Sequence, residues 1–190
     1  MEVERVTLGV VGDAGVGKTT LVVSFTANYV CQEYRPTALD AFSTIVRLND
    51  ALVVDLRIWD NAGSKEYCGL RPLTYPQTEV FLVCFSLKSR KSFENVTRVW
   101  IPEIYKTVGT RPFVLVGCKR DDCVFGADGN SDVVGTIEGE AMARRLGAVT
   151  YVETSAIEQS GFTDCFHTAI HAALEERKSP TLARDRTFTI

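Results

Sequence analysis

The chain has 190 residues, of which 45% are hydrophobic, and its formal net charge is -3 at pH 7. This size and hydrophobic content suit one domain with a single core, which we expect at residues 1–178, followed by a short tail at 179–190. The negative charge argues against a whole-surface electrostatic grip on nucleic acid.

Six cysteines without CxxC spacing indicate reduced thiols and a cytoplasmic protein. The first residues, MEVERVTLGVVG, contain no long apolar run, so neither a signal peptide nor a membrane span is expected there.

Apolar runs bounded by turns alternate with segments of helical period, which predicts an α/β fold with a mainly parallel sheet. Strands are predicted at 5–12, 42–50, 51–60, 79–87, 111–120 and 148–156. The second and third are joined at Asn49-Asp50, a polar pair typical of a hairpin turn. Helices are predicted at 18–28, 92–108, 137–146 and 161–177, and the glycine-bearing stretch 126–135 is predicted to be a long loop.

The stretch GDAGVGKTT matches GxxxxGK[ST] through Gly12, Gly17, Lys18 and Thr19, between a predicted strand and a predicted helix. Such a phosphate-binding loop (P-loop) turns backbone N–H groups toward phosphates, and the helix N-terminus adds positive charge. Lys18 would reach the β- and γ-phosphates, and the Thr19 hydroxyl would bind Mg²⁺. The alternative is an ordinary glycine-rich turn. The expected nucleotide contacts here are Asp13, Ala14, Gly15, Val16, Gly17, Lys18, Thr19 and Thr20.

Two later segments, GCKRDD and ETSA, resemble the guanine-recognition motifs [N/T]KxD and SA of the small GTPases of the Ras superfamily. The resemblance implies that Asp121 accepts hydrogen bonds from guanine N1–H and the exocyclic amine. Lys119 would lie along the base, and Ser155 and Ala156 would close the pocket. The alternative for CKRDD alone is a charged strand end at the surface.

Two further segments resemble the switch loops of that superfamily. WDNAG, residues 59–63, is similar to the DxxG motif, which implies that Asp60 holds Mg²⁺ through water and that the Gly63 N–H touches the γ-phosphate. YRPTALDAF, residues 34–42, resembles the first switch of Rho-type proteins, in which Thr37 would complete the Mg²⁺ shell only when a γ-phosphate is present. These contacts order both loops in the triphosphate state and release them after hydrolysis.

Residues 71–87 and 92–104 also resemble Rho and Rac segments, and the likeness extends from about residue 5 to about residue 176. The chain is therefore identified as resembling an atypical member of the Rho family. This implies a P-loop NTPase of the Ras-like type, with a six-stranded mostly parallel sheet, one antiparallel hairpin and helices on both faces. It also implies GTP or GDP as the bound nucleotide, Mg²⁺ as the cofactor, and a role in signal transduction to the actin cytoskeleton, cell shape or polarity.

Two departures from the family pattern predict slow hydrolysis. Ala14 stands where Rho proteins have glycine, and its methyl would enter space needed by the catalytic machinery. Ser64 stands where the family has the glutamine that orients the attacking water, and serine is too short for that task. No confident catalytic residue remains. The alternative is that both replacements are neutral and compensated nearby.

Two departures in the guanine pocket predict fast nucleotide exchange. Val30 stands where the family stacks an aromatic ring on guanine, unless the neighbouring Tyr29 takes over. Cys118 replaces an Asn or Thr that ties the base loop to the phosphate loop, and a thiol is a weak donor.

The resemblance implies effector proteins that bind a surface containing Tyr34, Thr37, Leu39, Asp40 and Phe42. Trp59 would help to select exchange factors, or it is simply a partly buried strand residue. We expect a monomer without nucleic acid partners. No C-terminal lipidation motif is visible, so membrane contact would occur at the periphery through partners.

Three functions remain open. The first is a Rho-type switch with impaired hydrolysis, and the second is a GTP-locked pseudo-GTPase that acts as an interaction module. The third is a metabolic P-loop kinase, which would need an arginine-bearing lid and a second-substrate site that the sequence does not show.

Overall fold

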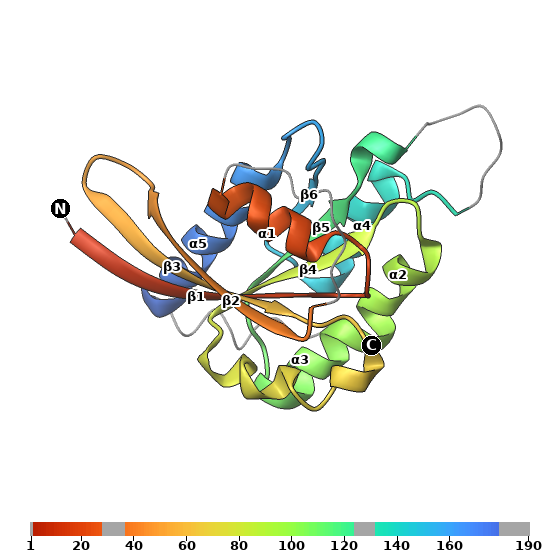
Figure 1. The fold of residues 1–190 in the computed structure, drawn as a ribbon, viewed down its shortest axis with the longest axis horizontal. Helices are drawn as coiled ribbons and strands as arrows, with labels where there is room; N and C mark the ends of the chain where they lie inside the picture. Colours follow the sequence, from red (N-terminus) through yellow and green to blue (C-terminus); the bar gives the residue numbers. More distant parts are fainter. Residues whose placement is uncertain (1, 28–36, 124–131, 179–190) are drawn as a thin grey trace.

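The structure is a computed structural model that describes residues 2–27, 37–123 and 132–178. Its centre is a six-stranded sheet with the strand order β2-β3-β1-β4-β5-β6 (Figure 1). The strands are β1 (Glu2–Gly12), β2 (Leu39–Arg47), β3 (Leu52–Asn61), β4 (Val80–Ser86), β5 (Phe113–Cys118) and β6 (Tyr151–Glu153). All six predicted strands are confirmed, although β2 begins at Leu39 rather than at residue 42 and β6 is shorter than expected.

Neighbouring strands run parallel except for β2 and β3, which form the expected antiparallel hairpin. Asn49 closes its turn, because Asn49 Oδ1 accepts hydrogen bonds from the backbone amides of Ala51 and Leu52, both at 2.9 Å. The carboxyl ends of β1, β3, β4 and β5 point to the same edge of the sheet, where α/β proteins bind ligands.

Helices cover both faces of the sheet, so the predicted fold class is confirmed (Figure 1). One face packs against α1 (Lys18–Ala27) and α5 (Phe162–Lys178). The other packs against α2 (Arg90–Asn95), α3 (Ile101–Val108) and α4 (Thr136–Leu146). Two buried clusters result, since successive strand residues point to opposite faces, and every residue of the central strand β4 is buried.

The predicted helix at 92–108 is interrupted. A π-helical turn at Val96–Trp100 separates α2 from α3, and in it the Ile101 N–H donates to the carbonyl of Val96. Pro102 accounts for part of the interruption, because proline has no N–H to donate in the first turn of α3.

Short 3-10 turns, which the sequence did not predict, follow two of the strands. Three of them, Lys65–Tyr67, Arg71–Leu73 and Tyr75–Gln77, come after β3, and Arg120–Asp122 comes after β5.

Two expected segments fall partly or wholly outside the described residues. Of the predicted loop at 126–135, residues 132–135 are described and contain neither helix nor strand. The predicted tail at 179–190 lies outside the described part. Within the described ranges, every helix is too short or too polar to cross a membrane.

Candidate nucleotide-binding site

The loop between β1 and α1 depends on glycine. Gly12 and Gly17 have φ angles of 146° and 115°, in the region that favours glycine. A Cβ on Gly12 would also lie 2.2 Å from the carbonyl oxygen of Cys84 on β4, so a side chain is excluded there. Because α1 begins at Lys18, its free N–H groups and the positive end of its dipole lie at this loop. The arrangement is suited to binding an anion.

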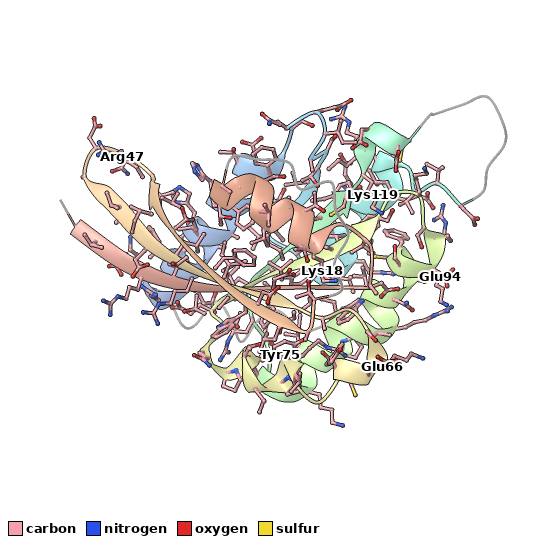
Figure 2. The ribbon with its side chains drawn as sticks, viewed as in Figure 1. Lys18, Arg47, Glu66, Tyr75, Glu94 and Lys119 are labelled. Carbon is pink, nitrogen blue, oxygen red and sulfur yellow. The ribbon has the colours of Figure 1, made fainter. Side chains whose placement is uncertain are left out.

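Lys18 is buried beside the loop, with 6% of its surface exposed (Figure 2). Its Nζ donates to the carbonyl oxygens of Gly12 and Asp13, both at 2.9 Å. Burial lowers the pKa of Lys18, and the negative charge of Asp60 acts in the opposite direction. An anionic ligand stabilises a buried ammonium group, and phosphate is the anion that this type of loop accommodates.

Three segments bring oxygen atoms together next to Lys18. Thr19 Oγ1 donates to Asp60 Oδ2 at 2.5 Å and lies 2.9 Å from Thr37 Oγ1. The other oxygen of Asp60, Oδ1, is buried and has no hydrogen-bond partner among the described residues. Burial raises the pKa of Asp60, and a cation would favour its ionised form. Hydroxyl and carboxylate oxygens are ligands that Mg²⁺ accepts, so the donor set fits this ion.

Gly63 packs directly on the phosphate-binding loop. A Cβ on Gly63 would lie 2.3 Å from the backbone nitrogen of Ala14 and 2.5 Å from the carbonyl oxygen of Gly12. Only glycine fits in this contact, which places the backbone of Gly63 beside Ala14. Ala14 itself is exposed at the top of the loop.

A pocket of about 410 Å³ opens beside the loop, at the ends of β5 and β6. Its volume is in the range of pockets for small organic ligands. Ser155 Oγ donates to Asp121 Oδ1 at 2.5 Å and thereby fixes this carboxylate. Lys119 has a φ of 65°, a strained conformation that is enriched at functional sites. Six of the ten residues that line this pocket are predicted site residues, namely Gly17, Thr20, Cys118, Lys119, Asp121 and Ala156.

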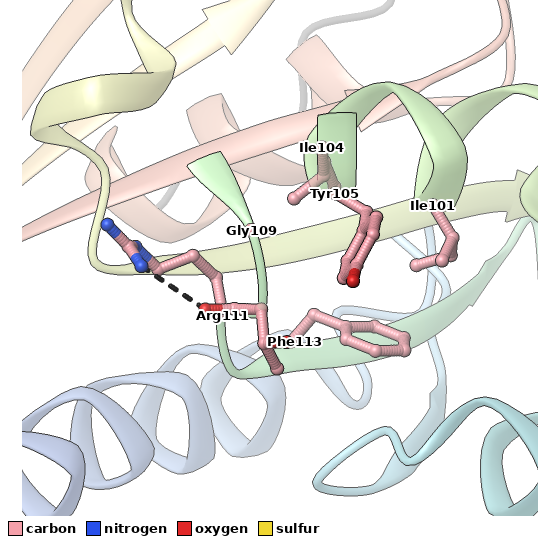
Figure 3. Close-up of a pocket in the computed structure, with 7 residues that line it drawn as sticks. Ile101, Ile104, Tyr105, Gly109, Arg111 and Phe113 are labelled. Atoms are coloured by element: carbon pink, nitrogen blue, oxygen red, sulfur yellow. Dashed lines mark hydrogen bonds between the residues drawn. The ribbon is translucent and has the colours of Figure 1, made fainter. Parts of the chain in front are cut away.

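A second hollow lies between α3 and the start of β5, where Ile101, Ile104 and Phe113 meet Tyr105 and Arg111 (Figure 3). Its volume of about 10 Å³ is enough for roughly one water molecule. It is too small for a nucleotide, so the pocket beside the phosphate loop is the candidate base site.

Comparison with known proteins now identifies the family. The sequence profile of the Ras family matches residues 7–175. The chain belongs to the Ras family. GTP-binding protein RHO4 of Saccharomyces cerevisiae (strain ATCC 204508 / S288c) is 37% identical over 181 residues, which cover 95% of this chain and 61% of that protein. The chain thus spans less than two thirds of that relative's length, and the expected resemblance to Rho-type small GTP-binding proteins is confirmed.

The structure places part of the first-switch segment of this Ras-family protein. Val30 and Tyr34 lie in the stretch 28–36, outside the described residues, so their roles stay predictions. Leu39, Asp40 and Phe42 lie on β2, which is an edge strand of the sheet, with Asp40 exposed and Phe42 packed partly against the core.

Trp59 on β3 is partly buried, and its Nε1 has no hydrogen-bond partner among the described residues. Its burial agrees with the strand-residue alternative, while a role in exchange-factor selection stays a prediction.

Ser64 is at the start of the first 3-10 turn after β3. Its Oγ accepts a hydrogen bond from the Glu66 amide at 3.3 Å, which caps that turn. The hydroxyl therefore has a structural partner in its own segment, and Ser64 lies one residue beyond the Gly63 contact with the loop.

Cys118 ends β5 in contact with the phosphate loop. A Cβ on Gly17 would lie 3.4 Å from Cys118 Cβ and 3.9 Å from its Sγ, which is ordinary van der Waals contact. Hydrogen bonding with Cys84 lowers the pKa of the Cys118 thiol, whereas burial raises the pKa of Cys84. The thiol therefore lies near Gly17, at the position of the predicted brace, and its hydrogen bonding is with Cys84.

Sequence reasoning missed a group of polar contacts behind the phosphate loop. The side chain of Asp13 accepts hydrogen bonds from Asn95 and Trp100, and Arg71 is bonded to the backbone on both sides of Gly63. Their positions along the chain gave no local motif.

Proposed function

We propose that the chain is a Mg²⁺-dependent switch that binds GTP or GDP and hydrolyses GTP slowly. The meeting of Thr19, Thr37 and Asp60 is the observation that carries this proposal. Thr37 comes from the first-switch segment, and its hydroxyl lies 2.9 Å from that of Thr19. In the bound state Mg²⁺ would offset the negative charge of the phosphates, with Thr19, Thr37 and Asp60 as its protein partners.

The base pocket supports guanine as the bound base. Ser155 donates to one oxygen of Asp121, which lines the pocket, and an ionised carboxylate can accept further hydrogen bonds from a ligand with two donors. Guanine presents N1–H and an exocyclic amine on one edge, while adenine does not. The metabolic kinase alternative receives no support from this pocket.

The surroundings of Gly63 support slow hydrolysis. The backbone of Ala14 lies beside Gly63, and the methyl group of Ala14 would narrow the space for a terminal phosphate. The hydroxyl of Ser64 caps its own turn, and its side chain has no amide with which to orient water.

Single-turnover hydrolysis of preloaded GTP tests the proposal. The natural protein, Ala14→Gly, Ser64→Gln and the double variant are compared, with and without a broad-range Rho activating protein. We expect the double variant to be faster by about tenfold or more, since positioning errors of this kind cost up to about a hundredfold. Ser43→Gln, at an exposed residue of β2, is the matched control. Equal rates for the natural protein and the double variant would contradict slow hydrolysis.

A GTP-locked interaction module is the second candidate, and the pair Ala14 and Ser64 favours it as well. The two candidates differ in turnover alone. If the purified protein carries GTP, and no hydrolysis above the uncatalysed rate is measured even with the activating protein, the second candidate is the correct one.

The partners proposed for this switch are effectors at the first-switch surface, Tyr34, Thr37, Leu39, Asp40 and Phe42, and exchange factors at Trp59. Support for the effector surface comes from β2, whose edge offers backbone groups to an added strand. We propose a monomer in the cytoplasm that reaches membranes through partners and acts on the cytoskeleton or cell polarity. Size-exclusion chromatography with light scattering tests the monomer.

A further inference from the structure

Arg71 is a buried cation, with 3% of its surface exposed. Its Nε and Nη2 donate to the two carboxylate oxygens of Glu103 at 2.8 and 2.6 Å. Its Nη1 donates to the carbonyl oxygens of Ala62 and Ser64 at 3.1 and 3.0 Å. A buried charge is tolerated only when it is paired and hydrogen-bonded. Arg71 therefore joins α3 to the backbone on both sides of Gly63.

Glu103 is held from a second side by Tyr75. This tyrosine is fully buried and donates its hydroxyl to Glu103 Oε1 at 2.6 Å. Burial, and then the neighbouring carboxylate, raise the pKa of Tyr75, so that the phenol stays protonated and continues to donate. A bidentate pair with an additional donor leaves little rotational freedom, so the guanidinium of Arg71 is fixed in one orientation.

Trp100 connects the same guanidinium to the phosphate loop. The Arg71 Cζ lies 4.9 Å from the centre of the Trp100 ring, a cation–π distance. Trp100 Nε1 donates to Asp13 Oδ1 at 2.8 Å, and Asn95 Nδ2 donates to Asp13 Oδ2 at 2.6 Å. Both oxygens of Asp13 are held, which ties the loop to α2 and the π-helical turn.

The π-helical turn explains how Asn95 and Trp100 share one carboxylate. Residues five apart are separated by about 140° around a regular α-helix, so they face different directions. An i→i+5 turn such as Val96–Trp100 brings such residues close to the same face. The unusual turn therefore aims two donors at Asp13.

We propose that Arg71 is a positioning residue that sets the preference of the site for a nucleoside triphosphate over a diphosphate. Its two bonds to the carbonyls of Ala62 and Ser64 hold the backbone on both sides of Gly63, whose N–H would meet a terminal phosphate under the proposed function. A diphosphate has no group at that place, so its binding does not depend on Arg71. The inference rests on the proposed function, which supplies the nucleotide.

Trp100 has a different role under this proposal. Its bond to Asp13 supports the loop that receives the phosphates of either nucleotide. Removing that bond should weaken triphosphate and diphosphate by the same factor, which distinguishes support of the loop from positioning of Gly63.

The test is the dissociation constant of GDP and of a non-hydrolysable GTP analogue, both with Mg²⁺, measured for the natural protein and four variants. Arg71→Met keeps an apolar stem and removes every donor. Glu103→Gln keeps the shape and weakens the pairing, and Trp100→Phe keeps a ring and removes the N–H. Arg98→Met is the matched control, because Arg98 has a 71% exposed side chain paired with Glu94 on the same helical segment.

We expect Arg71→Met to weaken the GTP analogue by about tenfold, the effect of losing one well-placed hydrogen bond, and GDP by less than about twofold. Glu103→Gln should change the ratio of the two dissociation constants, for the GTP analogue and for GDP, in the same direction but by a smaller factor. Trp100→Phe should weaken both nucleotides equally, and Arg98→Met neither. If Arg71→Met loses its cooperative unfolding transition, the ratio measured for Glu103→Gln decides the matter.

An equal loss of GDP and of the analogue in Arg71→Met, or no loss of either, would overturn the proposal. In that case Arg71 has a structural role alone. If the natural protein bound neither nucleotide, the proposed function would fail, and the role of Arg71 with it. If GDP is bound well and the ratio does not change in either variant, only the role of Arg71 fails.

Discussion

The phosphate end and the guanine end of the site are held in different ways. At the phosphate end, Lys18 and Asp60 are buried, and hydrogen bonds connect the loop to β3, α2 and the π-helical turn. At the guanine end, an open pocket of about 410 Å³ is bordered by Asp121, held by Ser155, and by Cys118, which packs against the loop. Several hydrogen bonds connect the phosphate loop to other elements, whereas Cys118 at the guanine end lies next to the loop without such a bond.

The departures from the Rho pattern fall differently at the two ends. At the phosphate end they affect Ala14 and Ser64, neither of which is fully buried. At the guanine end the resemblance implies that Cys118 replaces a residue that supports the base loop. We therefore expect the phosphate end to bind phosphates tightly while it hydrolyses slowly, and the guanine end to bind its base less tightly.

The largest expected effect is at the phosphate end. Lys18→Met removes a charge that makes two buried hydrogen bonds, so GDP and GTP should bind at least about a hundredfold more weakly. Isothermal titration calorimetry measures the change, with Lys91→Met, at an exposed lysine, as the control. A loss smaller than that of Asp121→Ala would reverse the comparison between the two ends.

The next effect concerns base choice at the guanine end. Asp121→Ala should reduce the affinity for GDP by about ten- to a hundredfold, because it removes charge-assisted hydrogen bonds to the base. The weak affinity for ADP should not change, since adenine lacks the matching donors. Competition binding with both nucleotides measures this, and Asp50→Ala, at an exposed aspartate in the hairpin turn, is the control. Parallel losses for GDP and ADP would show that Asp121 does not read the base.

A smaller effect should follow from strengthening the guanine end. Cys118→Asn introduces an amide at the contact with Gly17, and a new hydrogen bond of about 1 kcal/mol should slow GDP dissociation by about fivefold. Stopped-flow release of a fluorescent GDP gives the rate, with Cys68→Ser, at an exposed cysteine, as the control. If Cys118→Asn releases GDP at the natural rate or faster, the thiol is not the weak point of this end.

The smallest effect is expected away from both ends. Arg90 donates to both carboxylate oxygens of Glu138 at 2.7 and 3.0 Å, and this pairing lowers the pKa of Glu138 below its ordinary 4.5. The resulting stability is present above pH 4.5 and is lost as pH falls through the lowered pKa. Glu138→Gln should reduce the free energy of unfolding at pH 7 by less than about 1 kcal/mol, since both side chains are partly exposed.

Urea denaturation from pH 3 to pH 7 measures this difference, which should shrink toward the acid end of the range. Nucleotide affinity should be the same in both proteins. A change of affinity in Glu138→Gln would mean that α4 is coupled to one of the two ends.

The sequence predicted the parts of the molecule that depend on neighbours along the chain. Glycines, Lys18 and Thr19 stand together in one loop, and alternating apolar runs gave the strands. The hairpin followed from Asn49, whose side chain bonds to amides two and three residues away. These elements need no information about distant contacts.

The supports behind the loop could not be predicted in this way. Asp13 and Trp100 are 87 positions apart, and Arg71 and Glu103 are 32 apart, so each pair exists only in the folded chain. The π-helical turn could not be predicted from the sequence either, because its residues have an ordinary helical composition. Its role depends on Asp13, which is distant along the chain.

The π-helical turn at Val96–Trp100 also fixes the phase of α3 relative to α2. Each residue of an α-helix advances the chain by about 1.5 Å and rotates it by about 100°. The i→i+5 turn takes up one residue more than a regular helical turn, so the residues on its two sides face almost as residues four apart do on a continuous α-helix. The extra residue is absorbed within the turn, and Trp100 and Glu103 remain aligned with Asp13 and Arg71.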